Sequence, residues 1–278
     1  MPELPDLIYI EKRLQSILLG KSITEVMVKQ PIVLRVLVTG PFETSLCNRM
    51  FESIYRRGPF LGFQLDRDLE LVIHPMLAGR LKLTSGSGKA GRGLCFSLIL
   101  NDDLCLHYLD DKKMGKVYLI KQGDYAPIPR YVQQGVDILS DEFTLTRFQE
   151  LIVKQRKQVR VFVMDQTVLS AIGNAYADEI LFKAHLHPKT FCYQLSPGDV
   201  ERLYESIKGV MRWGVKQVEK AQQPIEIKVR DHMKVRNRKD QPCPRCGSTI
   251  RRAGVLGFDT FFCPRCQPAV RKQFIEWS

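Results

Sequence analysis

Apolar and polar positions follow two different periods along the chain. Apolar side chains recur every three or four positions over residues 6–18, which predicts an amphipathic helix with Asp6, after Pro5, at its N-terminal cap. From Ser22 to Ile120 the apolar stretches become short and are separated by Gly, Pro and Asp, as in a β-sandwich or barrel. The strands that we expect there are residues 23–28, 62–65, 69–73, 94–100, 104–108 and 116–120.

Helical spacing returns in the second half of the chain. It starts at Thr144 and continues over residues 168–185, where Ile172-Gly173-Asn174 divides it into two pieces. A further helix is expected from Ser196 to about Ala221. Its start is indicated by a proline near the first helical position and an aspartate three residues after the serine.

Two stretches fit neither period. Residues 123–129 contain glycine and two prolines, and we interpret them as a linker. Residues 222–240 are polar and basic, and we expect them to be extended or mobile. These breaks divide the chain into three predicted parts, which are residues 1–128, 129–222 and 223–278.

The composition is that of a globular protein with a basic excess. Of the 278 residues, 44% are hydrophobic and 26% charged, and no apolar run is long enough to cross a bilayer or to act as a secretory signal. We therefore expect a cytoplasmic protein with no membrane partner. The net charge of +12 is uneven, because the three parts contain 17 bases and 14 acids, 13 and 11, and 12 and 5. A basic excess in the last part indicates a polyanionic partner such as nucleic acid rather than uniform surface solubility.

Four of the eight cysteines are spaced as metal ligands. Cys243 and Cys246 form one Cys-x2-Cys pair and Cys263 and Cys266 form another, with sixteen residues between the pairs. Two such turns place four thiolates around Zn²⁺ as a tetrahedron. Disulfides are the alternative, which the lack of an export signal disfavours. We expect one structural Zn²⁺ on a β-hairpin, and we expect the other four cysteines to be buried apolar thiols.

Three local patterns occur together in a fixed order. The chain begins Met1-Pro2-Glu3-Leu4-Pro5-Asp6, its middle holds Met164-Asp165-Gln166 and the segment 172–182, and its end holds the two cysteine pairs. Together they resemble the formamidopyrimidine-DNA glycosylase and endonuclease VIII family over roughly residues 2–270. The resemblance implies an α+β protein with an N-terminal β-sandwich, a helix–two-turn–helix domain and a C-terminal zinc-finger β-hairpin, with DNA in the cleft between them.

The resemblance assigns chemistry to the first residues. If Met1 is removed, Pro2 carries a free secondary amine, which is nucleophilic when unprotonated. In the family this amine attacks C1′ of the damaged nucleotide, expels the base and leaves an iminium that permits strand cleavage by elimination. Glu3 would handle the proton transfers at the sugar ring oxygen. Without the resemblance, a flexible terminus and a surface carboxylate would be the simpler explanations of Pro2 and Glu3.

Asn174 is expected in the break between two helical pieces. Gly173 before it allows a tight turn, and the backbone N–H groups of a helix start can hold a phosphate. Asn174 resembles the phosphate-binding asparagine of the family. Capping of the helix is the alternative or additional role.

Two further segments resemble DNA-contacting loops. The loop after His74 resembles the one that enters the gap left by a flipped base, with Leu77 where the family usually has Met. Residues 110–115 resemble the loop that supplies an Arg and a Phe wedge, with Lys112 and Met114 at those positions. Apolar wedges offset the cost of unstacking. The alternative for Leu77 and Met114 is a place in the core, and for His74 a structural role instead of a phosphate contact.

Two positions depart from the family. Pro59 stands where the family usually has a Lys after Gly, and Phe258 stands where the finger usually has an Arg that clamps the phosphates of the flipped nucleotide. Two cations near the lesion are therefore missing. Arg57, Arg251 and Arg252 are the nearby candidates to replace them.

The sequence therefore predicts a bifunctional DNA glycosylase and abasic-site lyase that acts on oxidised bases through an N-terminal proline Schiff base. Its expected partner is damaged or abasic double-stranded DNA, bound by a monomer. Pro2 and Glu3 favour this enzyme, whereas Pro59 and Phe258 favour a weakly catalytic or non-catalytic damage-binding protein on the same fold. A zinc-ribbon RNA-binding protein would explain the basic last part but not the first and middle patterns.

Overall fold

Residues 1–86 and 88–269 are described by the computed structural model, in which the backbone contacts separate two units. The first unit contains Met1–Gln134 and Val215–Val229, and the second contains Gly135–Gly214 and the chain from Arg230 onward. The end of the predicted third part, residues 270–278, lies outside the described residues, and the boundaries at 128 and 222 stay predictions. No helix in the described part of the chain is long and apolar enough to cross a membrane.

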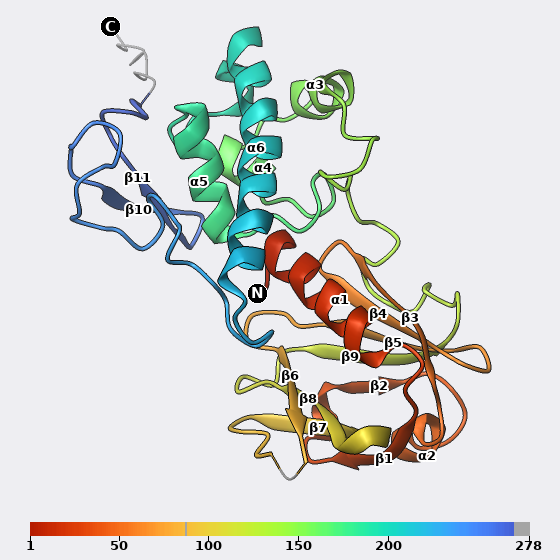
Figure 1. The fold of residues 1–278 in the computed structure, drawn as a ribbon. Coiled ribbons are helices and arrows are strands. Elements are labelled where there is room, and N and C mark those ends of the chain that lie inside the picture. The colour runs from red at the N-terminus through yellow and green to blue at the C-terminus, as the bar shows by residue number, and fades with distance from the viewer. Residues whose placement is uncertain (87, 270–278) are drawn as a thin grey trace, which may run out of the picture. The chain divides into compact units, whose positions relative to one another are not determined.

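Nine strands of the first unit form two sheets, seen as two layers in Figure 1. One sheet is antiparallel and has the order β1 (Ile23–Val28), β7 (Leu94–Leu100), β8 (Leu104–Leu109) and β6 (Arg80–Ser85). The other has the order β2 (Leu34–Val36), β9 (Lys116–Lys121), β5 (Leu69–His74), β4 (Phe60–Leu65) and β3 (Phe51–Arg57), with a parallel β2–β9 pair. Short helical turns connect strands at η1 (Pro31–Val33), α2 (Phe42–Leu46) and η2 (Asn101–Asp103).

The β-sandwich is the architecture that the short apolar stretches predict, but three of its strands are absent from the predicted set. Strand β2 is only three residues long. Strands β3 and β6 carry polar or charged side chains at half or more of their positions, so their apolar signal is weak. Prediction from apolar spacing therefore misses strands that are very short or that carry many polar side chains.

Helix α1 (Leu4–Leu18) starts two residues before the predicted position. The prediction of Asp6 as N-cap is wrong, because Glu3 holds that position and Asp6 is the third residue of the helix. The Asp6 carboxylate accepts a hydrogen bond from the Glu3 N–H at 2.8 Å, which is one half of a capping box. Pro5 fits inside the first turn because its missing N–H has no partner there in any helix.

The predicted linker at residues 123–129 is packed against the sandwich. Tyr55 and Tyr125 both donate to the buried carboxylate of Glu70, and the hydroxyls of Tyr55 and Tyr131 lie 2.7 Å apart. We call these four residues the tyrosine cluster. It ties the stretch that leaves the sandwich to strands β3 and β5.

The second unit combines helices with a β-hairpin. Its elements are α3 (Leu145–Val153), α4 (Val159–Val163), α5 (Asn174–Ala184), η3 (Cys192–Gln194), α6 (Pro197–Ala221, of which the last turns belong to the first unit), β10 (Arg251–Val255) and β11 (Phe258–Phe262). Helix α3 begins where the apolar spacing predicts, and the Thr144 side chain caps it by accepting from Arg147 N. Helix α6 begins where its start signal predicts, and Asp199 exchanges hydrogen bonds with Ser196.

The predicted helical piece before Gly173 is not a helix. Leu169 instead pairs with Val136 in an isolated bridge, and Ala171 has a left-handed backbone with φ of 61°. The Gln166 side chain accepts from Ala171 N at 2.7 Å and donates to Ile172 O at 2.8 Å. These hydrogen bonds replace those of a helix, so the apolar spacing here reflects burial without helical structure.

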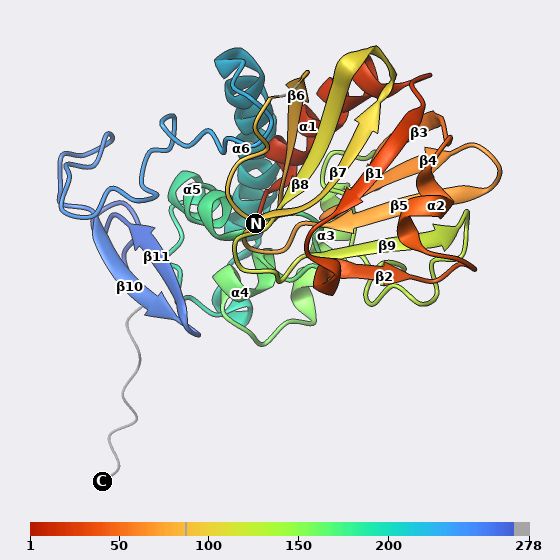
Figure 2. The same ribbon diagram turned by 90° about the horizontal axis from the view of Figure 1, so that it is seen from below.

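The hairpin β10–β11 packs on α5 (Figure 2). An apolar cluster joins the helix, the following loop and the hairpin, and it consists of Phe182, Val235, Cys243, Ile250, Phe261 and Cys263. Residues 222–240 contain no helix or strand, but Met233 and Val235 are buried. The finger therefore shares a core with the helical part of its unit.

Candidate functional site

The amino terminus lies against the loop that follows β5. Met1 N donates to the carbonyl oxygen of Leu77 at 3.1 Å, and Lys228 Nζ donates to the same oxygen at 3.4 Å. Pro2 and Glu3 are buried next to it. Burial, followed by the charge of Lys228, lowers the pKa of the Met1 amine to about 5. An amine in this place is therefore unprotonated, and so nucleophilic, at neutral pH.

Lys228 is the residue of this site that sequence reasoning misses. It stands in the polar stretch 222–240 among several other cations, and no spacing distinguishes it from them. Its contact with Leu77 joins residues 151 positions apart. Only the path of the chain after α6 brings it to the amino terminus.

The loops that carry Leu77 and Met114 meet at one tyrosine. Strands β6 and β8 are neighbours, so the loop before β6 and the loop after β8 lie at the same end of the sheet. A Cβ at Gly79 or at Gly115 would collide with the hydroxyl of Tyr108. Both loops therefore need glycine to close over this side chain.

Both wedge candidates are exposed at this end of the sheet. Leu77 is 51% exposed and Met114 is 40% exposed, which excludes the core alternative for them. Lys112 is exposed as well. The buried carboxylate of Asp110 accepts from Lys112 N at 3.0 Å and from Gly115 N at 2.7 Å, so it fixes the loop backbone while the side chains stay free.

His74 has a structural role. Its Nδ1 accepts from Met76 N at 3.0 Å, and its ring packs edge-on against Phe60 at 4.6 Å. Burial lowers the pKa of His74 to about 4, so the ring is neutral at pH 7. It holds the backbone before Leu77, and its contact with a phosphate stays a prediction.

Pro59 is buried in the turn between β3 and β4, next to Gly58 with φ of 53°. The nearby Arg57 is engaged elsewhere: its Nε donates to Tyr131 O at 3.0 Å, and its guanidinium lies 5.3 Å from the centre of the Tyr131 ring. Arg57 is thus tied to the tyrosine cluster.

In the second unit, Asn174 is the first residue of α5 and Gly173 is the N-cap. The prediction that Asn174 caps the helix is therefore wrong. The buried Arg160 donates from Nη2 to Asn174 Oδ1 at 2.8 Å. With its oxygen occupied in this way, the Asn174 amide has its NH₂ group left as a donor at the start of the helix.

The buried carboxylate of Asp178 links α5 to the hairpin. It accepts from Arg160 Nε at 3.2 Å, from Arg236 Nη1 at 2.9 Å and from Thr260 Oγ1 at 2.7 Å. Arg160 and Arg236 also both donate to the carbonyl oxygen of Asp259. Burial raises the pKa of Asp178, and the two guanidinium groups act against that shift. The orientation of Asn174 and the position of the hairpin thus depend on one network.

At the end of the hairpin, Phe258 is 50% exposed and supplies no charge. Arg252 forms two hydrogen bonds of 2.7 Å with the Asp259 carboxylate. Arg251 is exposed and its side chain has no hydrogen-bond or ion-pair partner within the residues described. Of the three candidate replacement cations, only Arg251 is uncommitted.

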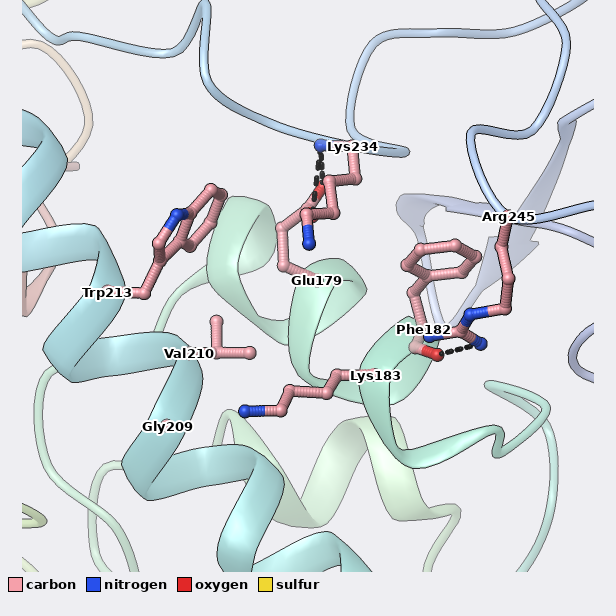
Figure 3. A pocket seen from close by; sticks show the side chains of 8 residues that line it. All are labelled: Glu179, Phe182, Lys183, Gly209, Val210, Trp213, Lys234 and Arg245. Carbon is pink, nitrogen blue, oxygen red and sulfur yellow. Dashed lines mark hydrogen bonds between the residues drawn. The ribbon is translucent and has the colours of Figure 1, made fainter.

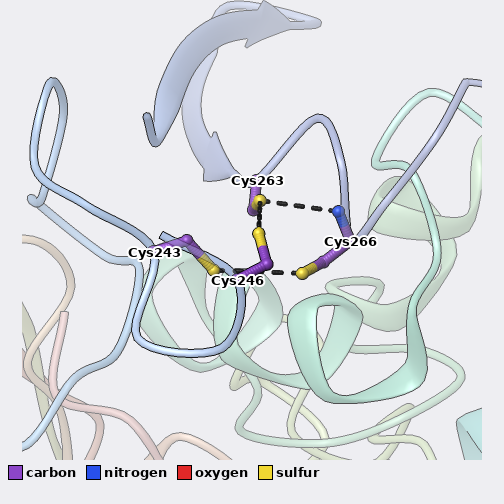
Figure 4. Close-up of side chains that lie close together, drawn as sticks. All are labelled: Cys243, Cys246, Cys263 and Cys266. Carbon is purple, nitrogen blue, oxygen red and sulfur yellow. Dashed lines mark hydrogen bonds between the residues drawn. The ribbon is translucent and has the colours of Figure 1, made fainter. Parts of the chain in front are cut away.

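The four paired cysteines converge on one point (Figure 4). The Sγ atoms of Cys243 and Cys266 are 3.9 Å apart, those of Cys246 and Cys263 are 3.5 Å apart, and all four lie within 4.8 Å of one another. Zn–S bonds of about 2.3 Å in a tetrahedron require sulfurs about 3.8 Å apart. No described cysteine is in a disulfide. The geometry fits one structural Zn²⁺, as predicted.

The remaining cysteines agree with the prediction except at one position. Cys95, Cys105 and Cys192 are buried, and burial raises the pKa of each thiol. Cys47 is partly exposed, so the prediction that it is buried is wrong. It follows the short helix α2 on the surface of the sandwich.

Sequence models match three stretches of the chain. The formamidopyrimidine-DNA glycosylase N-terminal domain matches residues 1–117, the H2TH domain of that glycosylase matches residues 134–224, and the zinc finger found in FPG and IleRS matches residues 240–269. The predicted fold of β-sandwich, helix–two-turn–helix domain and zinc-finger hairpin is thereby confirmed.

Individual proteins match over almost the whole chain. The formamidopyrimidine-DNA glycosylase of Symbiobacterium thermophilum is 31% identical over 274 residues, which are 96% of this chain and 90% of that one. The solved structure of MutM (Fpg) from Thermus thermophilus has a TM-score of 0.85 and 28% identity, covering 97% of this chain and all of that one. The Lactococcus lactis Fpg in complex with DNA containing an abasic site has a TM-score of 0.86 and 25% identity, covering 96% and 100%.

Proposed function

The chain belongs to the formamidopyrimidine-DNA glycosylase family, and from that premise we propose that it is a DNA glycosylase and abasic-site lyase of base-excision repair. Its partner in this proposal is duplex DNA with an oxidised base or an abasic site. The Lactococcus lactis relative binds DNA with an abasic site, which supports this choice. The observation that carries the proposal is the amino terminus, where the partly buried Met1 amine of lowered pKa stands beside the buried Glu3.

The proposed reaction starts at Pro2 after removal of Met1. The Pro2 nitrogen forms a bond to C1′ while the bond from C1′ to the base breaks, and the base leaves with the electron pair and takes up the proton that the Pro2 amine gives up. The C1′–O4′ bond then opens as Glu3 delivers a proton to O4′, which leaves an iminium between Pro2 and C1′. The iminium acidifies the C2′ proton, so its loss eliminates the 3′ phosphate. Water finally hydrolyses the iminium and frees Pro2.

Lys228 has a positioning role in this scheme. Its ammonium shares the Leu77 carbonyl oxygen with the terminal amine, so a second positive charge next to it is unfavourable. The environment that lowers the pKa of the Met1 amine is the one that the Pro2 amine would occupy one residue later. Lys228 would thus keep the nucleophile unprotonated.

The DNA contacts in this proposal use both units. Leu77 and Met114, held by their glycine-containing loops, would fill the gap left by the flipped nucleotide. Lys112 would contact the orphaned base without the planar fork of an arginine, which weakens base reading. The NH₂ group of Asn174 would donate to a phosphate.

A weakly catalytic or non-catalytic damage-binding protein is the second candidate. Pro59 and Phe258 favour it, because Arg57 and Arg252 are engaged in other contacts. A positioned cation or general acid is commonly worth about 10²–10⁴ in rate. We therefore expect cleavage at a pre-formed abasic site to be faster than excision of 8-oxoguanine, because an abasic site needs no help with a leaving base.

Borohydride trapping separates the two candidates. Protein that begins at Pro2 is incubated with abasic and 8-oxoguanine duplexes under borohydride, and the adduct is mapped by mass spectrometry. An adduct at Pro2, lost in Glu3→Gln on the 8-oxoguanine duplex, supports the enzyme. Tight binding of damaged DNA without any adduct supports the binding protein. An adduct at Lys228 would remove Pro2 from the mechanism.

A further inference from the structure

A cavity of about 360 Å³ lies in the second unit between α5, α6 and the loop that leads into the finger (Figure 3). None of the residues assigned above to catalysis, wedging or zinc binding lines it. Its volume falls in the range of small-molecule sites. The cavity is therefore a separate feature of this chain.

One wall of the cavity is fixed by Glu179. Its buried carboxylate accepts from the backbone N–H groups of Lys234, Val235 and Arg236 at 2.8–3.0 Å. This contact holds the loop against α5 and places the Lys234 ammonium 5.4 Å from the centre of the Trp213 ring. The position of one cation next to an aromatic wall is thus built into the fold.

Two further cations, Lys183 and Arg245, line the cavity and are also positioned by specific neighbours. Lys183 lies one turn after Glu179, and a Cβ at Gly209 would collide with its ammonium, so the glycine leaves the space that Lys183 occupies. Arg245 lies 4.2 Å from the centre of the Phe182 ring and donates to Phe182 O at 3.1 Å. Figure 3 shows these side chains around the same space as Val210 and Trp213.

The cavity lining has more cationic than acidic side chains, namely Lys183, Lys234 and Arg245 against Glu179. Glu179 is the one acidic residue among its described lining, and its carboxylate is occupied by backbone N–H groups. The ammonium groups of Lys183 and Lys234 have no hydrogen-bond or ion-pair partner in the described part of the chain. Two exposed ammonium groups without a protein partner, beside an apolar wall of Val210 and Trp213, suit a ligand with an anionic group at one end and a planar ring at the other.

We propose that this cavity binds a nucleoside phosphate, with the base against Trp213 and the phosphate between Lys183 and Lys234. Stacking on tryptophan accepts any base, and phosphate oxygens accept charge-assisted hydrogen bonds from ammonium groups. Inorganic phosphate alone would make no contact with the apolar wall, and an apolar ligand would give the two ammonium groups no anionic partner. The nucleoside phosphate is either a free mononucleotide or the terminal nucleotide of a single strand.

The fluorescence of Trp213 reports occupancy of this cavity. The chain has two tryptophans, so the titration uses full-length protein with Trp277→Phe, and calorimetry provides a second measurement. We expect dAMP to give a saturable response and adenosine, which lacks the phosphate, to give at most a much weaker one. A 5′-phosphorylated trinucleotide that binds more tightly than dAMP would identify a strand end as the natural ligand, and the reverse order would identify a free nucleotide.

Charge variants test the assigned contacts. Lys183→Met and Lys234→Met should each weaken dAMP binding about tenfold or more, as for loss of a hydrogen bond to a charged group. Gly209→Ala should weaken binding while every charge is retained, because it displaces the Lys183 ammonium. Lys189→Met, which removes an exposed lysine outside the cavity, should have no effect. Equal affinity for adenosine and dAMP, equal loss in Lys189→Met, or no saturable response up to about 1 mM would overturn the proposal.

Discussion

The amino-terminal site and the network around Asp178 use positive charge in opposite ways. At the amino terminus, burial and then the charge of the neighbouring Lys228 lower the pKa of the terminal amine. Around Asp178, Arg160 and Arg236 stand next to a buried carboxylate and compensate it. The first arrangement favours loss of a proton, whereas in the second the two guanidinium groups act against the burial that raises the pKa of Asp178.

The tyrosine cluster shows a third kind of surroundings for an ionisable group in this protein. Glu70 is as deeply buried as Asp178, but its carboxylate is held by Tyr55 and Tyr125 and not by a cation. Burial raises its pKa, and the phenol hydrogen bonds act against that shift. Burial alone therefore does not set the charge state of an ionisable group in this protein. The neighbouring groups decide whether it stays charged, is neutralised or becomes reactive.

Blocking the terminal amine should have the largest effect. In a form that retains Met1 or an N-terminal tag, the Pro2 nitrogen is an amide and cannot form an iminium. Borohydride trapping on abasic DNA should fall at least about 10³-fold relative to the same protein after cleavage to Pro2, since the nucleophile is lost. DNA affinity, measured by fluorescence anisotropy, should stay within about threefold because phosphate contacts carry it. Equal trapping by the blocked form would contradict this account.

Loss of zinc should disrupt the finger and leave the sandwich folded. Cys263→Ser or chelation removes the metal that the small hairpin needs, so amide exchange should rise over residues 234–269 and not over β4, β5 and β9. DNA binding should fall sharply. Cys47→Ser, at a partly exposed cysteine outside the cluster, is the control and should keep one zinc per chain. Purified protein without zinc, or with these four thiols in disulfides, would refute the metal assignment.

Asp178→Asn tests the charge-compensating network. It leaves the buried guanidinium group of Arg160 and the partly buried one of Arg236 without their carboxylate, and removal of one partner from a buried pair typically costs about 3–5 kcal/mol. Urea unfolding should show this loss, together with weaker DNA binding as Asn174 loses its fixed neighbour Arg160. Asp240→Asn, at an exposed pair with Lys239, should change the stability by less than about 1 kcal/mol. Similar losses for both variants would mean that the network has no special role.

Lys228→Met should have the smallest and most specific effect. Loss of the neighbouring charge raises the pKa of the terminal amine, so the acidic limb of the pH profile for borohydride trapping should move up by as much as about one unit. Trapping below that limb should slow by up to about tenfold, with little change at pH 8. Lys228→Arg keeps the charge and should keep the profile. An acidic limb that stays in place in Lys228→Met would show that burial alone sets the pKa.

The sequence by itself determined the elements and the motifs. The period of apolar residues placed α1, α6 and six of the nine strands of the first unit, because burial of one face imposes a local pattern. Cysteine spacing located the zinc site, since two short turns can supply four ligands without knowledge of the rest of the chain. The first residues and the segment around Asn174 pointed to the family for the same reason: each motif lies within a few consecutive residues.

Only the tertiary structure decided how these parts are oriented and activated. It brought Lys228 to the amino terminus, closed the loops of Leu77 and Met114 over Tyr108, and turned the Asn174 amide with Arg160. It also showed that Arg57 is engaged by Tyr131. These contacts join residues up to 151 positions apart, and no local period encodes them. They depend on the path of the whole chain, which fixes distances and burial and thereby the charge state of each group.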